Sequence, residues 1–174
     1  VTAVLLGSGV RDLSAKLARY GADRVIVVDD EALEPYMTEP YTQAMTEVVK
    51  TYKPAIVLFG ATAIGRDMAP RVSARVHTGL TADCTKLEIG VAGENVEEGK
   101  TDAIGNLMMT RPAFGGNIMA TILCPEHRPQ MATVRPGVMQ RTAPVENASC
   151  PVVDFKVAGL SEHRNVDVLE VIKK

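Results

Sequence analysis

Residues 54–79 read PAIVLFGATAIGRDMAPRVSARVHTG, and this stretch decides the fold. Residues 55–59 are an unbroken apolar run, which is typical of a parallel strand covered on both faces. Residues 60–65 lead into a helical pattern that ends at Gly79, a common C-terminal stop. The apolar residues on one face of this helix are Ile64, Met68, Val72 and Val76. The stretch therefore predicts a strand, a loop and a helix.

Pro70 lies inside this helical pattern. Its ring would crowd the carbonyl group of Arg66 in a regular helix. We therefore expect either a distorted first turn or a regular helix that starts nearer Met68.

The residues before this stretch repeat the alternation of strand and helix. Residues 3–6 and 25–28 are apolar strands, and Val10, Leu13 and Leu17 have helical spacing between them. A further helix opens at Pro40, with apolar positions at Tyr41, Ala44, Met45, Val48, Val49 and Tyr52, and closes at Lys53 and Pro54. The order βαβαβα predicts a parallel sheet with right-handed crossovers.

The second half has the alternating apolar and polar pattern that is typical of strands. Leu87, Ile89 and Val91 alternate with polar residues, and residues 93–100 read as a polar turn. Further strands are predicted at 107–110, 118–123, 132–134 and 152–157, and residues 166–174 read as a strand or a tail. We predict an α/β fold with a mostly parallel sheet, flanking helices and additional, partly antiparallel strands in the second half.

The composition excludes several classes of protein. The 174 residues are 46% hydrophobic and 23% charged, with a net charge of −2, which fits one globular domain and no nucleic-acid or membrane-surface binder. No apolar run approaches the roughly 18 residues of a membrane helix, and the first residues lack a signal-peptide pattern. We expect a cytoplasmic protein whose three separated cysteines are reduced thiols.

The Gly7-Ser8-Gly9 turn begins like a dinucleotide-binding fingerprint, with Asp29 near the distance at which an acid holds a ribose. Asp12, however, occupies the position of the third glycine, where a side chain opposes close packing of helix on strand. The turn is therefore either a nicotinamide-cofactor site or, as we favour, a plain strand-to-helix turn.

Other residues that could bind a metal or take part in catalysis give little indication of a site. The three histidines have no second ligand at metal-binding spacing, and no serine or cysteine has the setting of an activated nucleophile. Asp67 and Arg71 form an i, i+4 pair typical of a solvated helix face. The sequence predicts neither a metal site nor a catalytic residue.

The loop at 111–117, RPAFGGN, is the strongest candidate for ligand contact on physical grounds. Gly115 and Gly116 allow a close approach of backbone N–H groups, Phe114 can pack on a flat ring, and Arg111 offers a fixed positive charge. The same residues also suit any sharp turn.

Three segments carry a resemblance to a known family: 59–84 (FGATAIGRDMAPRVSARVHTGLTADC), 110–117 (TRPAFGGN) and 132–138 (ATVRPGV). Over nearly its whole length the chain resembles the alpha subunit of electron transfer flavoprotein. The likeness is closest to the alpha subunits of anaerobic bacteria, including those that work in electron bifurcation.

The resemblance implies that residues 1–174 are the Rossmann-like N-terminal domain, which pairs with the beta subunit. In that family a separate C-terminal domain carries the mobile FAD, and its flavin-binding motifs are absent from these residues. The implied role is that of an electron carrier component rather than a stand-alone enzyme. Electrons come from a flavin dehydrogenase such as an acyl-CoA dehydrogenase, or from NADH in bifurcating members, and this domain alone is not expected to hold FAD tightly.

The resemblance also implies a site. In bifurcating members Arg111, Phe114, Gly115, Gly116 and Asn117 are expected to form a wall beside the beta-bound flavin, with Gly65 and Arg66 as weaker candidates. Two alternatives stay open: a module that binds AMP or a related nucleotide at the carboxyl ends of its strands, and a structural interaction domain without flavin contact.

Overall fold

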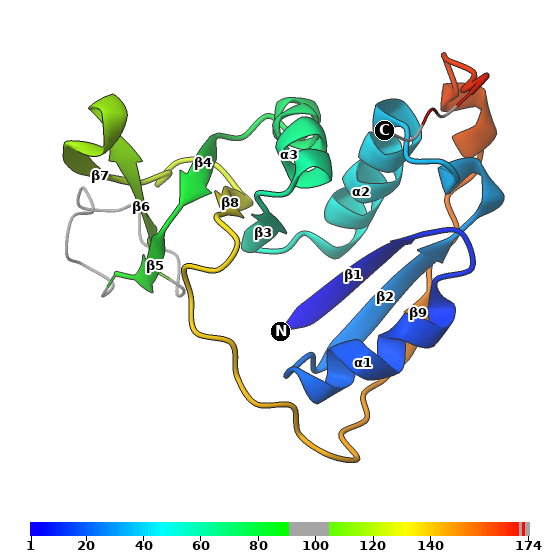
Figure 1. Cartoon of the computed structure of the whole chain (residues 1–174), viewed down its shortest axis with the longest axis horizontal. Coiled ribbons are helices and arrows are strands. Elements are labelled where there is room, and N and C mark those ends of the chain that lie inside the picture. Colours follow the sequence, from blue (N-terminus) through cyan, green and yellow to red (C-terminus); the bar gives the residue numbers. More distant parts are fainter. Residues whose placement is uncertain (91–104, 171, 173–174) are drawn as a thin grey trace. The chain divides into compact units, whose positions relative to one another are not determined.

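The computed structural model of the chain describes residues 1–90, 105–170 and 172. These residues divide into two compact units, Val1–Val48 with Arg141–Lys174, and Val49–Gln140. Figure 1 labels the strands and the α-helices of both. No helix in the described residues is long and apolar enough to cross a membrane.

The first unit contains a three-stranded parallel sheet with the order β1-β2-β9. Its strands are β1 (Thr2–Gly7), β2 (Arg24–Asp29) and β9 (Val152–Asp154). The helical elements around them are η1 (Arg11–Leu13), α1 (Ser14–Arg19), η2 (Glu31–Leu33), α2 (Thr38–Tyr52), whose last residues belong to the second unit, and η4 (Leu160–His163). The core of this unit joins β2 to η2, α2 and η4 through Ile26, Val28, Leu33, Val48 and Leu160.

The second unit contains a parallel sheet and an antiparallel sheet. The parallel sheet has the order β3-β8-β4, and its strands are β3 (Ile56–Gly60), β8 (Gln130–Val134) and β4 (Leu80–Cys84). Helix α3 (Ala63–Arg75) is the crossover from β3 to β4. The antiparallel sheet has the order β5-β6-β7, and its strands are β5 (Lys86–Ile89), β6 (Leu107–Ala113) and β7 (Ile118–Ile122).

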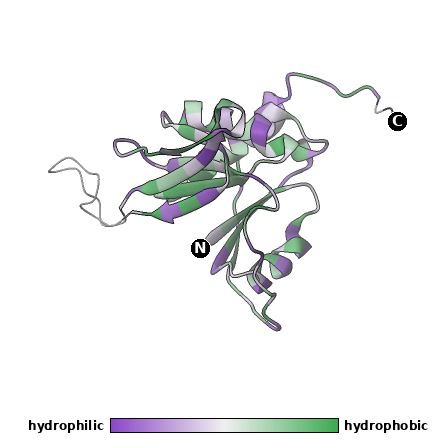
Figure 2. Ribbon diagram, turned by 60° about the vertical axis from the view of Figure 1, so that its left-hand side comes forward, coloured by the Kyte–Doolittle hydropathy of each residue, from purple (hydrophilic) through white to green (hydrophobic). Residues whose placement is uncertain are grey.

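Many hydrophobic residues of each unit lie on the strands, as the colouring in Figure 2 shows, and helices α2 and α3 add further buried residues. In the second unit Cys84, Leu107, Met109 and Ala132 form a buried cluster that ties β4, β6 and β8 together. Gln130 adds a buried polar link, since its Oε1 accepts the Leu107 N–H at 2.7 Å. The antiparallel sheet is therefore anchored to the parallel sheet through β6.

The predicted α/β class and the order of strands and helices through α3 are confirmed. The mainly parallel pairing and the partly antiparallel second half are also confirmed. The expected single sheet is wrong, because the strands of the described residues form three separate sheets: β1 and β2 do not pair with β3, and β5, β6 and β7 form a sheet of their own. Of residues 166–174, those described form neither helix nor strand, which fits a tail. The predicted polar turn at 93–100 lies outside the described residues.

Two local expectations are wrong. Strand β3 is not covered on both faces, because Leu58 is 51% exposed between the buried Val57 and Phe59. Of the two alternatives given for α3, the start near Met68 is wrong, because the helix begins at Ala63 with Pro70 inside it. Thr62 caps this helix, because its Oγ1 accepts the Gly65 N–H at 3.2 Å, so the helix forms from its first turn despite the proline.

Candidate functional site

The carboxyl ends of β3, β8 and β4 lie at one edge of the parallel sheet, the edge where ligands gather in open α/β folds. Asp83 lies on β4 at this edge, where the register of β4 against β8 is irregular. Its backbone is left-handed, with φ of +63°, a conformation that costs a non-glycine residue about 1 kcal/mol. The hydroxyl of the buried Thr133 accepts the Asp83 N–H at 2.8 Å and helps to hold this conformation.

Asp83 binds Arg135, the first residue after β8, through a two-pronged ion pair. Arg135 Nε donates to Oδ1 at 3.1 Å, and Nη2 donates to Oδ2 at 2.6 Å. The Arg135 N–H also donates to the Cys84 carbonyl at 2.9 Å. This parallel geometry is the strongest form of arginine–carboxylate contact, and it fixes the plane of the guanidinium group.

Arg66 approaches the same carboxylate from the first turns of α3. Its Nε donates to the Ala61 carbonyl at 2.9 Å, and its Nη2 lies 3.6 Å from Asp83 Oδ1. The N-terminus of α3, whose dipole favours negative charge, is at this edge as well. Gly65 has a steric role here, because a Cβ on it would lie 1.9 Å from the Gly60 carbonyl oxygen.

Arg111 on β6 is the third arginine of the group. Its Nε is buried and has no hydrogen-bond partner among the described residues. Its charge lies close enough to Asp83 to help lower the pKa of that carboxyl, and it opposes the rise that burial causes in the pKa of the Cys84 thiol. We call Arg66, Arg111, Arg135 and Asp83 the arginine cluster; it carries three positive charges against one negative charge.

The pKa of Asp83 is lowered first by the Arg135 hydrogen bonds, and further by the charges of Arg135, Arg66 and Arg111. A carboxyl whose folded-state pKa lies below its unfolded value, about 3.9, stabilises the fold fully above that value. This stabilisation is lost as the pH falls through the folded pKa.

We expect Asp83→Asn to be less stable than the unchanged chain at neutral pH, with the difference shrinking below about pH 4. Urea denaturation at a series of pH values measures it. Asp67→Asn, which removes the i, i+4 partner of the exposed Arg71, is the control and should have the smaller effect. A difference for Asp83→Asn that does not change with pH would contradict the assigned ion pair.

The hairpin between β6 and β7 carries the other predicted site residues at its tip. Phe114, Gly115 and Gly116 form η3 (Phe114–Gly116), and Asn117 follows it. Gly115 and Gly116 have φ of +69° and +92°, which glycine adopts without strain, and Phe114 is 80% exposed. In the part of the chain that the structure describes, no side-chain hydrogen bond or ion pair joins this tip to the arginine cluster.

The structure thus brings together Gly65, Arg66 and Arg111 of the predicted site, while the tip residues form a separate group. Asp83 and Arg135 were missed. For Arg135 the available signal was its place directly after the predicted strand 132–134, whereas Asp83 lies on β4, a strand that was not predicted.

The backbone N–H groups of the turn after β1 are bound by the side chain of Asp29. The Asp29 carboxylate accepts the N–H groups of Gly9, Val10 and Arg11 at 2.6, 3.0 and 3.2 Å. These are the donors that a dinucleotide phosphate would need. The interpretation of this segment as a plain strand-to-helix turn is therefore favoured over a nicotinamide site.

Comparison with known proteins gives the family. Residues 1–160 match the family model described as the electron transfer flavoprotein domain. The chain belongs to the electron transfer flavoprotein family. Among relatives, it is 52% identical over 155 residues to the electron transfer flavoprotein subunit alpha of Thermoanaerobacterium thermosaccharolyticum, covering 89% of this chain and 43% of the relative.

Two further relatives match the whole chain or nearly all of it. The protein named FixB of Clostridium saccharobutylicum is 49% identical over 99% of this chain and 48% of its own length. The lactate dehydrogenase (NAD(+),ferredoxin) subunit LctC of Acetobacterium woodii is 41% identical over 100% of this chain and 39% of its own length. The resemblance to electron transfer flavoprotein alpha subunits is confirmed, and the chain spans about half the length or less of these curated relatives.

Proposed function

We propose that residues 1–174 are the N-terminal scaffold domain of an electron transfer flavoprotein alpha subunit in the cytoplasm. The domain pairs with a beta subunit, and a further part of the alpha subunit carries the mobile FAD. The complex takes electrons from a flavin dehydrogenase such as an acyl-CoA dehydrogenase or, in a bifurcating complex, from NADH. The relative named as a subunit of an NAD(+),ferredoxin lactate dehydrogenase supports the bifurcating form of this proposal.

The arginine cluster is the observation that supports a site for an anionic cofactor. Arg111 presents a buried Nε without a hydrogen-bond partner among the described residues, and Arg66 and Arg135 are held in place by Asp83. The surplus of two positive charges fits the phosphates of FAD and the negative charge of its reduced ring. FAD supplies the electron transfer, while these residues would orient the cofactor and raise its potential.

The proposed beta-subunit interface includes the antiparallel sheet and its hairpin tip. Large apolar side chains are exposed there on β5, η3 and β7: Ile89, Phe114, Ile118, Met119 and Ile122. Exposed apolar side chains gathered on one sheet are typical of a protein interaction surface. In the proposed complex Phe114 and the glycines after it form part of the wall beside the beta-bound flavin.

The test replaces Arg111 by alanine in the complete alpha–beta complex. Loss of one positive charge near the flavin should lower its two-electron potential by about 30 mV, the equivalent of about 1.4 kcal/mol. Redox titration of the complex measures this shift, and stopped-flow reduction by NADH gives the rate. Arg111→Lys should restore part of the potential.

Arg71→Ala is the matched control, because Arg71 is an exposed arginine on α3 that pairs with Asp67. It should leave the potential unchanged. If Arg111→Ala also left the potential and the NADH reactivity unchanged in a correctly assembled complex, the flavin-contact role would be wrong.

A second candidate function, a nucleotide-binding module without a redox role, rests on the same arginine cluster. Its position at the carboxyl ends of parallel strands suits an AMP phosphate. Calorimetric titration of the isolated chain with AMP, ATP and NADH separates the two proposals. Saturable binding that is lost in Arg66→Ala or Arg135→Ala would favour the nucleotide module.

A further inference from the structure

A pocket lies at the opposite edge of the same parallel sheet, where the strands begin. Lys53 and Pro54 lead into β3, and Arg128 and Pro129 lead into β8, and all four line the pocket. Its volume is about 420 Å³, which falls within the range of small-molecule sites. It is separate from the arginine cluster, because that cluster lies where the strands end.

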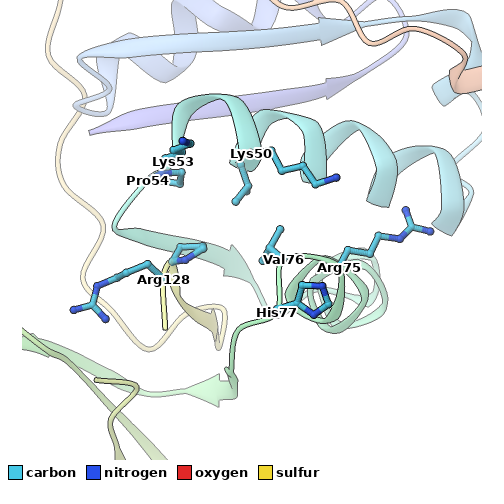
Figure 3. A pocket seen from close by; sticks show the side chains of 9 residues that line it. Lys50, Lys53, Pro54, Arg75, Val76, His77 and Arg128 are labelled. Carbon is cyan, nitrogen blue, oxygen red and sulfur yellow. The ribbon is translucent and has the colours of Figure 1, made fainter. Parts of the chain in front are cut away.

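The pocket combines basic side chains with apolar walls. Lys50, Lys53, Arg75 and His77 come from the ends of α2 and α3, and none of the residues that line the pocket is acidic. Pro54 and Val76 are among the apolar residues of the lining. In Figure 3 Lys50 and Arg75 extend to the same side of the pocket and Arg128 extends to the other.

Helix electrostatics accounts for only part of this charge. Lys50 and Arg75 lie in the last turns of their helices, where a cation is favoured. Lys53 and His77 lie just beyond the helix ends and have left-handed backbones, with φ of +44° and +54°. Glycine is the usual residue at such a position, because any other side chain strains the backbone. Two basic side chains therefore replace glycine on the rim of one pocket, and strain of this kind clusters at ligand sites.

The walls of the pocket are held together before any ligand arrives. Arg128 Nη1 donates to the carbonyl groups of Cys124, Pro125 and His127 at 3.1, 3.3 and 2.9 Å. Thr78 Oγ1 donates to the Pro129 carbonyl at 2.8 Å and so links the segment after α3 to the segment before β8. A pre-formed pocket binds without the loss of free energy that ordering a loop would bring.

We propose that this pocket binds a small phosphate-bearing organic anion of about mononucleotide size. The phosphate contacts the basic rim formed by Lys50, Lys53, Arg75 and His77. The organic part packs on the apolar wall that includes Pro54 and Val76. The proposal is independent of the flavin-contact role of the arginine cluster, because none of its residues belongs to that cluster.

The experiment uses AMP and inorganic phosphate as probes in calorimetric titrations of the chain. We expect saturable binding of AMP, weaker binding of inorganic phosphate, and a loss of AMP affinity of about tenfold or more in the double variant Lys53→Gly, His77→Gly. The same variant should keep or raise its melting temperature, because glycine relieves both left-handed positions. A structural role for Lys53 and His77 would instead lower it.

Control variants locate the binding. Arg71→Ala, on the exposed face of α3, should bind AMP like the unchanged chain. The proposal is overturned by any of three results: no saturable binding at millimolar AMP, binding that survives the double glycine variant, or binding that is lost in Arg66→Ala or Arg135→Ala. The last result would assign the anion to the arginine cluster.

Discussion

Replacing Gly65 by alanine is expected to destabilise the second unit by about 3 kcal/mol or more. A Cβ at this position would lie 1.9 Å from the Gly60 carbonyl oxygen, and both groups belong to the backbone. No rotamer change can relieve such a clash, so α3 would have to move away from the end of β3. Urea denaturation followed by circular dichroism measures the loss.

Gly60→Ala is the matched control in the same strand-to-helix turn. The nearest atom to a Cβ on Gly60 is the Thr62 Cγ2 at 3.8 Å, an ordinary van der Waals distance. This variant should lie within about 1 kcal/mol of the unchanged chain. Equal destabilisation by both alanines would show that the loss arises from chain flexibility rather than from the close approach of helix to strand.

The alternation of strands and helices through α3 could be predicted because local patterns determine it. Helix α2 has apolar residues at i, i+3, i+4, i+7, i+8 and i+11, and the structure places it at Thr38–Tyr52. Strand β2 was read from four consecutive apolar residues, all of which are buried. In both cases the period of the apolar residues matches the period of the backbone.

Strand β4 escaped prediction because it has no unbroken apolar run and its short alternation of apolar and polar residues does not match its burial. Residues 80–84 read LTADC, yet Thr81 is buried and Ala82 is exposed, and Asp83 has a left-handed backbone. Its partner β8 lies about fifty residues later in the chain and also pairs with β3. A strand held in place by such a distant neighbour has little local signature.

The long separation of β4 and β8 along the sequence also limited prediction of the site. Arg111 was selected from a glycine-rich loop, yet the structure places its charge near Asp83 rather than in a group with the tip residues. The Asp83–Arg135 pair spans 52 positions and forms only because β4 and β8 are neighbours with parallel ends. An arginine cluster of this kind depends on topology, whereas a capping residue such as Thr62 depends on its nearest neighbours.

Replacing Asp29 by alanine is expected to destabilise the first unit by about 2 kcal/mol. The substitution removes one carboxylate that accepts three backbone N–H groups, and hydrogen bonds to charged groups contribute about 1.5–3 kcal/mol each when shielded from water. The exposure of Asp29 reduces that contribution. Asp30→Ala is the control, because Asp30 accepts a single N–H, from Ala32 at 2.8 Å, and should lose about 1 kcal/mol.

The Asp29→Ala variant also tests whether the turn after β1 is an anion site that the carboxylate of Asp29 occupies. Three N–H groups that converge on one point form a nest, which binds phosphate or sulfate when no carboxylate fills it. Sulfate should therefore raise the stability of Asp29→Ala more than that of Asp30→Ala at matched ionic strength, since the general salting-out effect of sulfate acts on both. Equal responses would mean that the nest collapses once Asp29 is removed. A selective response would mean that Asp29 is the group that excludes a dinucleotide phosphate from this turn.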